Sequence, residues 1–225
     1  STGNEVLDPG DSLFDGAIYD SNRYTLTQLL KSVGCEVVDL GILEDDPKII
    51  ADALLSATIK FDLILTSGGV STGEEDHVRK VVENEGSLLF WRLAIKPGRP
   101  VALGQINDTV FIGLPGNPVA AMVTFLQIAR PIILKLSGAN DTAPKLFSVQ
   151  SDFSYKKKLH RREYVRVQIK KNGSGKLIAK KYKREGAGIL SSMVFADGFV
   201  ELSEDIVNVE KGDFVNYLPF SELGL

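Results

Sequence analysis

Short apolar segments alternate with amphipathic segments over residues 1–136, and most of the apolar segments end in a glycine-rich or acidic loop. Residues 62–66 are nearly all apolar, which is typical of a strand buried on both faces. Strands that alternate with helices of 10–15 residues form βαβ units. The pattern therefore predicts an α/β domain, a three-layer arrangement around a mostly parallel sheet. The predicted strands are residues 35–43, 62–66, 88–95, 101–104 and 109–113, and the predicted helices begin near residues 20–22, 46–47, 75 and 118.

The charge balance changes after residue 141. Residues 1–141 hold 11 basic and 19 acidic side chains, whereas residues 142–225 hold 15 and 10. The change follows a small, polar segment that is typical of a linker. We therefore expect two domains, residues 1–141 and residues 145–225. The second contains short alternating strands and an Asn172-Gly-Ser-Gly175 hairpin turn, which predict a small antiparallel β-barrel.

Composition limits the class of protein. Cys35 is the one cysteine, so a disulfide framework and a paired-cysteine metal site are excluded, and we expect a reducing, cytoplasmic setting. The apolar stretch from Pro118 to Leu136 contains Arg130 and Lys135 and is interpreted as a core helix, so no membrane partner is expected. A small-residue turn such as Ser1-Thr2-Gly3 usually follows a strand, and we expect this chain to be the later part of a longer protein.

Two loops carry the pattern of an anion site. The loop Ser67-Gly-Gly-Val-Ser-Thr-Gly73 leads into a predicted helix, so its backbone N–H groups and the helix N-terminus can hold phosphate. Leu114-Pro-Gly-Asn-Pro118 joins a predicted strand to a helix in the same way. In parallel sheets, ligands bind at the carboxyl ends of the strands. A purely structural turn, or a helix cap at Asn117, stays open as an alternative.

Charged side chains extend the predicted site. Glu5, Asp45 and Asp76 each follow a different predicted strand, and carboxylates that meet at one sheet edge suit a hard cation such as Mg²⁺. The alternative is that they are surface acids or helix caps. Two cations can bind anionic groups: Lys96, in the stiff turn Lys96-Pro-Gly-Arg-Pro100, and Arg92 upstream. The alternative is an ordinary turn whose charges are solvated.

Other functional classes receive little support. His77 and His160 have no second ligand at metal-binding spacing, and nucleophile-elbow and Walker motifs are absent. The basic run around residues 156–162 could suggest nucleic acid, but aromatic residues are sparse there. We interpret this run as a solvated strand edge and expect no nucleic-acid partner.

Taken in chain order, six motifs resemble one known family, the molybdopterin molybdenumtransferases (the MoeA family, which includes the E domain of gephyrin). The motifs are Ser-Thr-Gly-Asn-Glu5, Tyr19-Asp-Ser-Asn22, Gly34-Cys-Glu-Val, Ser67-Gly-Gly-Val-Ser-Thr-Gly-Glu-Glu-Asp76, Ile95-Lys-Pro-Gly-Arg-Pro100 and Gly113-Leu-Pro-Gly-Asn-Pro118. The resemblance covers essentially the whole chain. It implies a MogA-like molybdopterin-binding domain followed by the family's C-terminal β-barrel, without the family's two N-terminal domains.

The resemblance also implies an activity. The family inserts molybdate into adenylylated molybdopterin and releases AMP with the help of Mg²⁺, as a homodimer, and a molybdopterin adenylyltransferase is the expected supplier of the substrate. Glu5, Asp45, Asp76 and Lys96 are then the catalytic candidates, the three carboxylates being the Mg²⁺ ligands. The expected substrate-binding residues are Ser21, Asn22, Ser67, Gly68, Gly69, Val70, Ser71, Gly73, Arg92, Pro97, Gly98, Pro115, Gly116, Asn117, Pro118, Arg166 and Ser191.

One departure concerns the molybdate pocket. Many members have a serine in a Gly-Ser-Gly-like turn of the barrel domain, where this chain has Gly186-Ala187-Gly188. Arg166, Ser191 and Ser192 remain as candidate oxyanion contacts. Two further interpretations stay open: an adenylyltransferase of the MogA type, which the second domain and Ser71 disfavour, and a scaffold that binds a peptide near the barrel.

Overall fold

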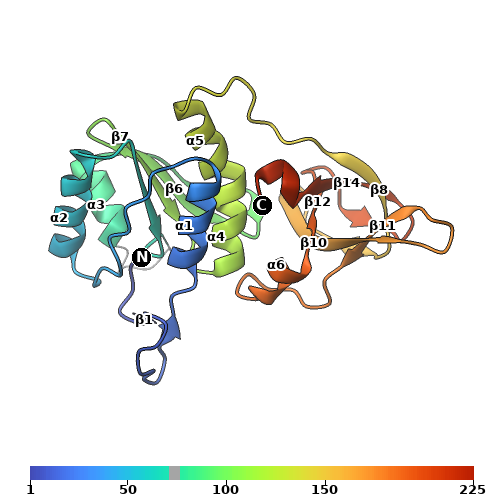
Figure 1. The fold of residues 1–225 in the computed structure, drawn as a ribbon, viewed down its shortest axis with the longest axis horizontal. Helices are drawn as coiled ribbons and strands as arrows, with labels where there is room; N and C mark the ends of the chain where they lie inside the picture. Colours follow the sequence, from blue (N-terminus) through green and yellow to red (C-terminus); the bar gives the residue numbers. More distant parts are fainter. Residues whose placement is uncertain (71–76) are drawn as a thin grey trace.

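The computed structural model describes residues 1–70 and 77–225 and has two lobes joined side by side (Figure 1). The first lobe is an α/β domain around a four-stranded sheet with the order β3-β7-β6-β4. These strands are β3 (Leu63–Ser67), β4 (Gly86–Arg92), β6 (Pro100–Ile106) and β7 (Thr109–Leu114). This lobe confirms the predicted α/β domain, and the second lobe, described below, confirms the predicted small β-barrel.

The sheet is mixed, whereas the sequence predicted mostly parallel pairing. Among the described strands, β3 and β7 are parallel, but β6 pairs antiparallel with both β7 and β4. The reason is loop length. Only Asn107 and Asp108 connect β6 to β7, and a two-residue turn can join only antiparallel neighbours. Asn107 has a positive φ of 51°, as such turns require.

Helices cover both faces of the sheet. One face packs α2 (Pro47–Thr58) and α3 (His77–Glu85) over Phe111, while the other packs α1 (Asn22–Ser32) and the helix after Pro118 over the neighbouring Ile112. Successive strand residues point to opposite faces, so adjacent apolar residues of β7 serve two cores. This is the predicted three-layer arrangement, and Asp46 caps α2 as expected by accepting from the N–H groups of Lys48 and Ile49.

The predicted strand over residues 35–43 is wrong. Among the described residues, its one strand-like pairing is a bridge between Thr2 and Leu43, beside a 2.8 Å hydrogen bond from the Leu43 N–H to the Ser1 carbonyl. A strand needs several paired neighbours, and this segment has one such pair in the described structure. A groove of about 650 Å³ lies there instead, lined by β3, α1 and residues 34–43.

The apolar stretch Pro118–Leu136 forms one long helix in three parts: α4 (Pro118–Thr124), the π-helical turn η1 (Phe125–Ala129) and α5 (Arg130–Leu136). Pro131 has no N–H, and in the turn before it the Arg130 N–H bonds to the Phe125 carbonyl. This is the one described helix with the length and apolar character of a membrane span. Its residues Val119, Phe125 and Ile133 belong to the core shared by the two lobes.

The second lobe is a small closed barrel. Its strands are β8 (Phe147–Ser151), β10 (Arg162–Lys171), β11 (Leu177–Lys181), β12 (Gly198–Leu202) and β14 (Phe214–Pro219). The sheet order β11-β8-β14-β12-β10 closes through an additional β10–β11 pairing. The pairing is antiparallel except between β8 and β11. The turn between β10 and β11 is the predicted one at residues 172–175.

Short elements complete the two lobes. They are β1 (Val6–Leu7), β2 (Ile18–Tyr19), β9 (Tyr155–Lys156), α6 (Ser191–Phe195), β13 (Asn208–Val209) and η2 (Phe220–Leu223). One more, β5 (Ile95–Lys96), lies in the chain between β4 and β6 but pairs with β10 of the barrel, with Lys96 opposite Glu163. This pairing carries Lys96 across to the barrel wall.

Candidate functional site

The side chain of Asn22 joins three of the predicted loops at the carboxyl ends of the strands. Its amide nitrogen lies 2.8 Å from Ser67 Oγ and 2.8 Å from the Gly116 carbonyl oxygen. Asn22 is buried because it begins α1 directly under these loops. The N–H of Gly68 donates to the Leu114 carbonyl, which closes the loops further. The loops that hold residues 67–69 and 114–117 therefore lie together as predicted, and Asn22, expected here from the resemblance, joins them.

Two glycines of this region are required by geometry. Gly68 and Gly69 have φ angles of 90° and 62°, in the left-handed region. A Cβ on Gly69 would lie 2.5 Å from Val78 Cγ2, and one on Gly68 would lie 2.7 Å from the Thr2 carbonyl oxygen. The loop backbone thus packs directly against the backbone of Thr2 and the side chain of Val78. Val70 is buried in the core, so any contact it makes with a ligand is through its backbone.

Of the three predicted carboxylates, Glu5 and Asp45 lie among the described residues. Asn4 and Asp45 exchange two hydrogen bonds, from Asn4 N to Asp45 Oδ2 (3.3 Å) and from Asp45 N to Asn4 Oδ1 (3.1 Å). The loop that holds Glu5 therefore lies beside the loop that holds Asp45. Ser71, Gly73 and Asp76 lie outside the described residues, and no group of three metal-ligating side chains occurs among residues 1–70 and 77–225.

A cleft of about 270 Å³ lies between the lobes. The barrel contributes residues between Tyr155 and Ala187 to its lining. The α/β domain contributes Lys96, Pro97, Gly98, Arg99, Pro100, Pro115, Asn117 and Ala120. Five of the lining side chains are cationic (Lys96, Arg99, Arg166, Lys181 and Arg184), and two are carboxylates (Glu163 and Glu185). Such an excess of positive charge in a concave site favours an anionic ligand.

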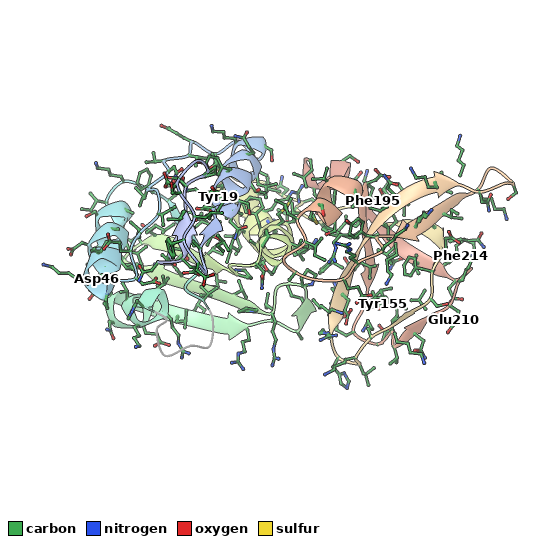
Figure 2. All side chains as sticks on the ribbon, turned by 90° about the horizontal axis from the view of Figure 1, so that it is seen from below. Tyr19, Asp46, Tyr155, Phe195, Glu210 and Phe214 are labelled. Atoms are coloured by element: carbon green, nitrogen blue, oxygen red, sulfur yellow. The ribbon has the colours of Figure 1, made fainter. Side chains whose placement is uncertain are left out.

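Lys96 is held by a network that sequence analysis did not anticipate. Its Nζ lies 3.2 Å from the Tyr155 hydroxyl and 3.5 Å from Glu163 Oε2, and Tyr155 in turn donates to Glu163 over 2.7 Å. Arg161 Nε donates to the other carboxylate oxygen over 2.9 Å. Glu163 is 1% exposed, so these donors satisfy a buried charge. Figure 2 shows Tyr155 on the barrel lobe.

Tyr155 also lies between two ammonium groups, because the Nζ atoms of Lys96 and Lys181 are 5.7 Å and 5.1 Å from its ring centroid. Burial, and next its hydrogen bond to Glu163, raise the pKa of Tyr155 well above its ordinary value. Tyr155 therefore stays a neutral hydroxyl that donates to Glu163. The sequence held one signal for Glu163, since it is one of only two acidic residues between Lys145 and Arg184.

Arg166 is the buried cation of the cleft. It extends from β10, is 9% exposed, and its Nη2 makes a long 3.4 Å contact with the Gly186 carbonyl. Its Nε has no hydrogen-bond partner among residues 1–70 and 77–225. Burial lowers the pKa of this guanidinium, but an arginine remains charged at neutral pH. A buried donor without an acceptor is uncommon in folded proteins.

The Gly186-Ala187-Gly188 turn forms one end of the cleft. The Ala187 carbonyl accepts from the N–H of Val119 over 2.9 Å, and so satisfies a backbone donor in the first turn of α4. Asn117 occupies the N-cap position of α4, as one alternative expected, but its side chain makes no capping hydrogen bond. Pro118 occupies the first turn of that helix, as expected.

Three expected residues lie apart from this cleft. Arg92 ends β4 as an exposed side chain, and Ser191 is exposed with its Oγ 3.3 Å from the Tyr182 hydroxyl. Ser21 precedes α1 without making a side-chain cap. None of the three lines the cleft between the lobes. Ser192 donates instead to the Ile189 carbonyl over 2.6 Å.

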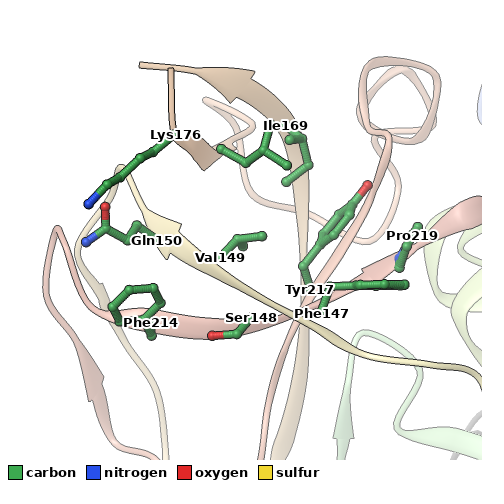
Figure 3. Close-up of a pocket in the computed structure, with 10 residues that line it drawn as sticks. Phe147, Ser148, Val149, Gln150, Ile169, Lys176, Phe214, Tyr217 and Pro219 are labelled. Carbon is green, nitrogen blue, oxygen red and sulfur yellow. The ribbon is translucent and has the colours of Figure 1, made fainter. Parts of the chain in front are cut away.

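A second cavity, of about 610 Å³, lies on the far side of the barrel. Figure 3 shows its apolar lining, which includes Phe147, Val149, Phe214 and Tyr217. Lys176 is its one charged lining residue. This cavity lacks the convergent cations that phosphate or another oxyanion requires.

Comparison with known proteins identifies the family of both domains. Residues 1–135 match the family model for a probable molybdopterin binding domain, and residues 148–220 match the MoeA C-terminal region, domain IV. The molybdopterin molybdenumtransferase of Haemophilus influenzae is 39% identical over 224 residues, which is 99% of this chain and 55% of the relative. The molybdenum cofactor synthesis protein cinnamon of Drosophila melanogaster is 35% identical over 207 residues, which is 90% of this chain and 34% of the relative.

The solved structures give the same result for the fold. The molybdopterin biosynthesis MoeA protein of Pyrococcus horikoshii superposes with a TM-score of 0.79 at 27% identity, covering 97% of this chain and 52% of that one. This chain spans about half the length of the Haemophilus and Pyrococcus relatives and about a third of the Drosophila one. Because both of its domains match in the same order, the chain belongs to the MoeA family of molybdenum cofactor biosynthesis proteins.

Proposed function

We propose that this chain carries the substrate-binding and molybdate-binding parts of a molybdopterin molybdenumtransferase. In this reaction, molybdate enters the dithiolene of adenylylated molybdopterin and the bond that holds AMP is hydrolysed. One observation carries the proposal. Pro115 and Asn117 line the cationic cleft, while the carbonyl of Gly116 between them accepts from Asn22 at the glycine loops. A single loop thus separates a phosphate-type site from an oxyanion-type site.

The residues of each site fit the chemistry of the proposed substrate. The glycine loops offer backbone N–H groups to the pyrophosphate and the pterin phosphate. Lys96 and Arg166 offer two cations, one of them with a free buried donor, to the tetrahedral oxyanion. Cations fixed in place before the reaction stabilise negative charge as it develops.

Glu5 and Asp45 would hold Mg²⁺ together with Asp76. Magnesium is bound in proteins by one or two carboxylates and the substrate's own phosphates, and the bonded pair Asn4–Asp45 brings the first two carboxylate loops together. When bound, the ion would neutralise charge on the pyrophosphate. The homodimer, the cytoplasmic setting and a molybdopterin adenylyltransferase as the supplying partner complete the proposal as inferences from the family.

The test is the dependence of cofactor formation on molybdate concentration. Lys96→Ala should require more molybdate, and added salt should weaken wild type more than the variant, because salt screens the charge that was removed. Lys170→Ala, which removes an exposed lysine from the outer end of β10, is the matched control and should behave as wild type. Identical curves for wild type and Lys96→Ala would overturn the assignment of the cleft. In the same assay, beside a full-length relative, we expect the isolated chain to bind the substrate but to turn it over poorly.

A further inference from the structure

The two carboxylates of the cationic cleft differ in how firmly they are held. Glu163 is 1% exposed and accepts from both Arg161 and Tyr155. Glu185 is 52% exposed, and its one close partner is Lys181, at 2.7 Å. Removing Glu163 from its donors would leave a buried charge without compensation, whereas an exposed ion pair such as Lys181–Glu185 separates at little cost.

Glu185 faces the same cations that an oxyanion in the cleft would contact. Its Oε2 is 3.8 Å from Lys96 Nζ, while its Oε1 binds Lys181. Its hydrogen bond with Lys181, followed by the charges of Lys181, Lys96 and Arg166, holds the pKa of Glu185 below its ordinary value. The carboxylate is therefore charged at neutral pH and offsets part of the positive charge in the cleft.

The backbone next to Glu185 belongs to the wall of the cleft. Gly186 follows it with a φ of 147°, and the Gly186 carbonyl is the acceptor of the long contact from Arg166. Arg166 Nε, in contrast, has no acceptor in the part of the chain that the structure describes. Glu185 thus neutralises the lysine side of the cleft and leaves the arginine side unsatisfied. An oxyanion bound between them would satisfy Arg166 and compete with Glu185 for the two lysines.

We propose that Glu185 is an internal counter-ion of the cleft, which pairs with Lys181 and Lys96 in the free protein and is displaced when a tetrahedral oxyanion binds. The proposal rests on the oxyanion site proposed above and adds a residue that tunes its affinity. Displacement makes binding weaker than the lysines alone would allow, and Glu185 again offsets part of the positive charge of the cleft when the anion leaves.

Equilibrium binding of molybdate to the 225-residue chain tests this at two ionic strengths. Glu185→Gln keeps the size of the side chain but removes its charge, so it should bind molybdate about two- to fivefold more tightly at low salt, the range of one exposed ion pair. The advantage should shrink at high salt. Glu210→Gln is the matched control, because Glu210 is an exposed barrel carboxylate outside the cleft, hydrogen-bonded to Ser154. It should bind molybdate as wild type does.

A structure of the chain with molybdate bound gives the second readout, in which the Lys181–Glu185 contact should be broken. Equal or weaker binding by Glu185→Gln, or an intact Lys181–Glu185 contact beside bound molybdate, would overturn the counter-ion role while leaving the oxyanion site in place. If wild type and Lys96→Ala bind molybdate equally, or if no variant binds it, the oxyanion site itself is wrong and the counter-ion role falls with it.

Discussion

The side-chain amide of Asn22 donates to the hydroxyl oxygen of Ser67 over 2.8 Å, although the two residues are 45 positions apart in the chain. The same amide also reaches the Gly116 carbonyl. The first residue of α1 is thereby tied to the ends of both parallel strands, β3 and β7, and the spacing of the three loops depends on this amide.

Asn22→Ala should therefore destabilise the fold. It leaves the buried Ser67 hydroxyl and the Gly116 carbonyl without this donor, which costs about 1–3 kcal/mol. Urea unfolding measures the difference. Ser21→Ala serves as the control, because the Ser21 side chain makes no cap bond, and it should stay within about 0.5 kcal/mol of wild type. Equal stabilities of the two variants would show that Asn22 does not join the loops.

Gly69→Ala should also be costly. The φ of 62° disfavours a side chain by about 1–2 kcal/mol, and the added Cβ would meet Val78 Cγ2 at 2.5 Å. Gly173→Ala is the comparison, since a Cβ there meets nothing within 4 Å. Thermal unfolding of the two variants should separate them clearly, with Gly69→Ala melting lower. A normal melting temperature for Gly69→Ala would mean that the loop relaxes freely.

Glu163→Ala is expected to lower the free energy of unfolding by about 2–3 kcal/mol, because it removes the acceptor of charged and neutral donors at a buried position. It should also release Lys96 and so raise the molybdate concentration needed for binding. Glu210→Ala removes an exposed carboxylate and should change neither quantity. Unchanged molybdate affinity in a folded Glu163→Ala protein would show that the network does not position Lys96.

Alkaline pH should destabilise the barrel through Tyr217. Burial, together with the nearby charge of Asp197, raises the pKa of Tyr217 from 10.0 to about 12. The folded state then holds this proton where the unfolded state has lost it. The resulting stability is fully present below pH 10 and is lost as the pH rises toward about 12.

The measurement is the free energy of unfolding as a function of pH for wild type and Tyr217→Phe. Tyr155 and Tyr164 also have raised pKa values and contribute to the loss in both proteins. The variant should therefore lose stability less steeply between pH 10 and pH 12. Parallel curves would mean that Tyr217 ionises equally well in the folded and unfolded states.

Local patterns predicted most of the elements. Alternation identified β10, β11, β12 and β14, and the cap Asp46 with Pro47 identified α2, because each depends on residues close together in the chain. The strand over residues 35–43 failed for the opposite reason. Its β-branched residues are suitable, but a strand also needs a partner along its length, and sequence pattern does not show which neighbour is present.

The same distinction, between features set by neighbouring residues and features that need distant partners, applies to the candidate site. Glycine loops are recognisable from composition, and the loops of Ser67 and Gly116 do lie together. Asn22, which joins them, was expected here only from the resemblance. Tyr155, Lys181 and Glu185 were missed because they carry no motif and reach the cleft only through barrel closure. Arg92 and Ser191 were expected near the anion, yet neither lines the cleft.

The pairing of β5 with β10 also bears on how the cleft responds to a ligand. Ile95 and Lys96 hydrogen-bond with the barrel while the residues on either side of them continue into strands of the α/β sheet. A rotation that opened the lobes at this point would have to break backbone hydrogen bonds. The backbone of Lys96 is consequently held beside the strand that carries Arg166 before any ligand binds, so an anion that binds here costs little backbone conformational entropy.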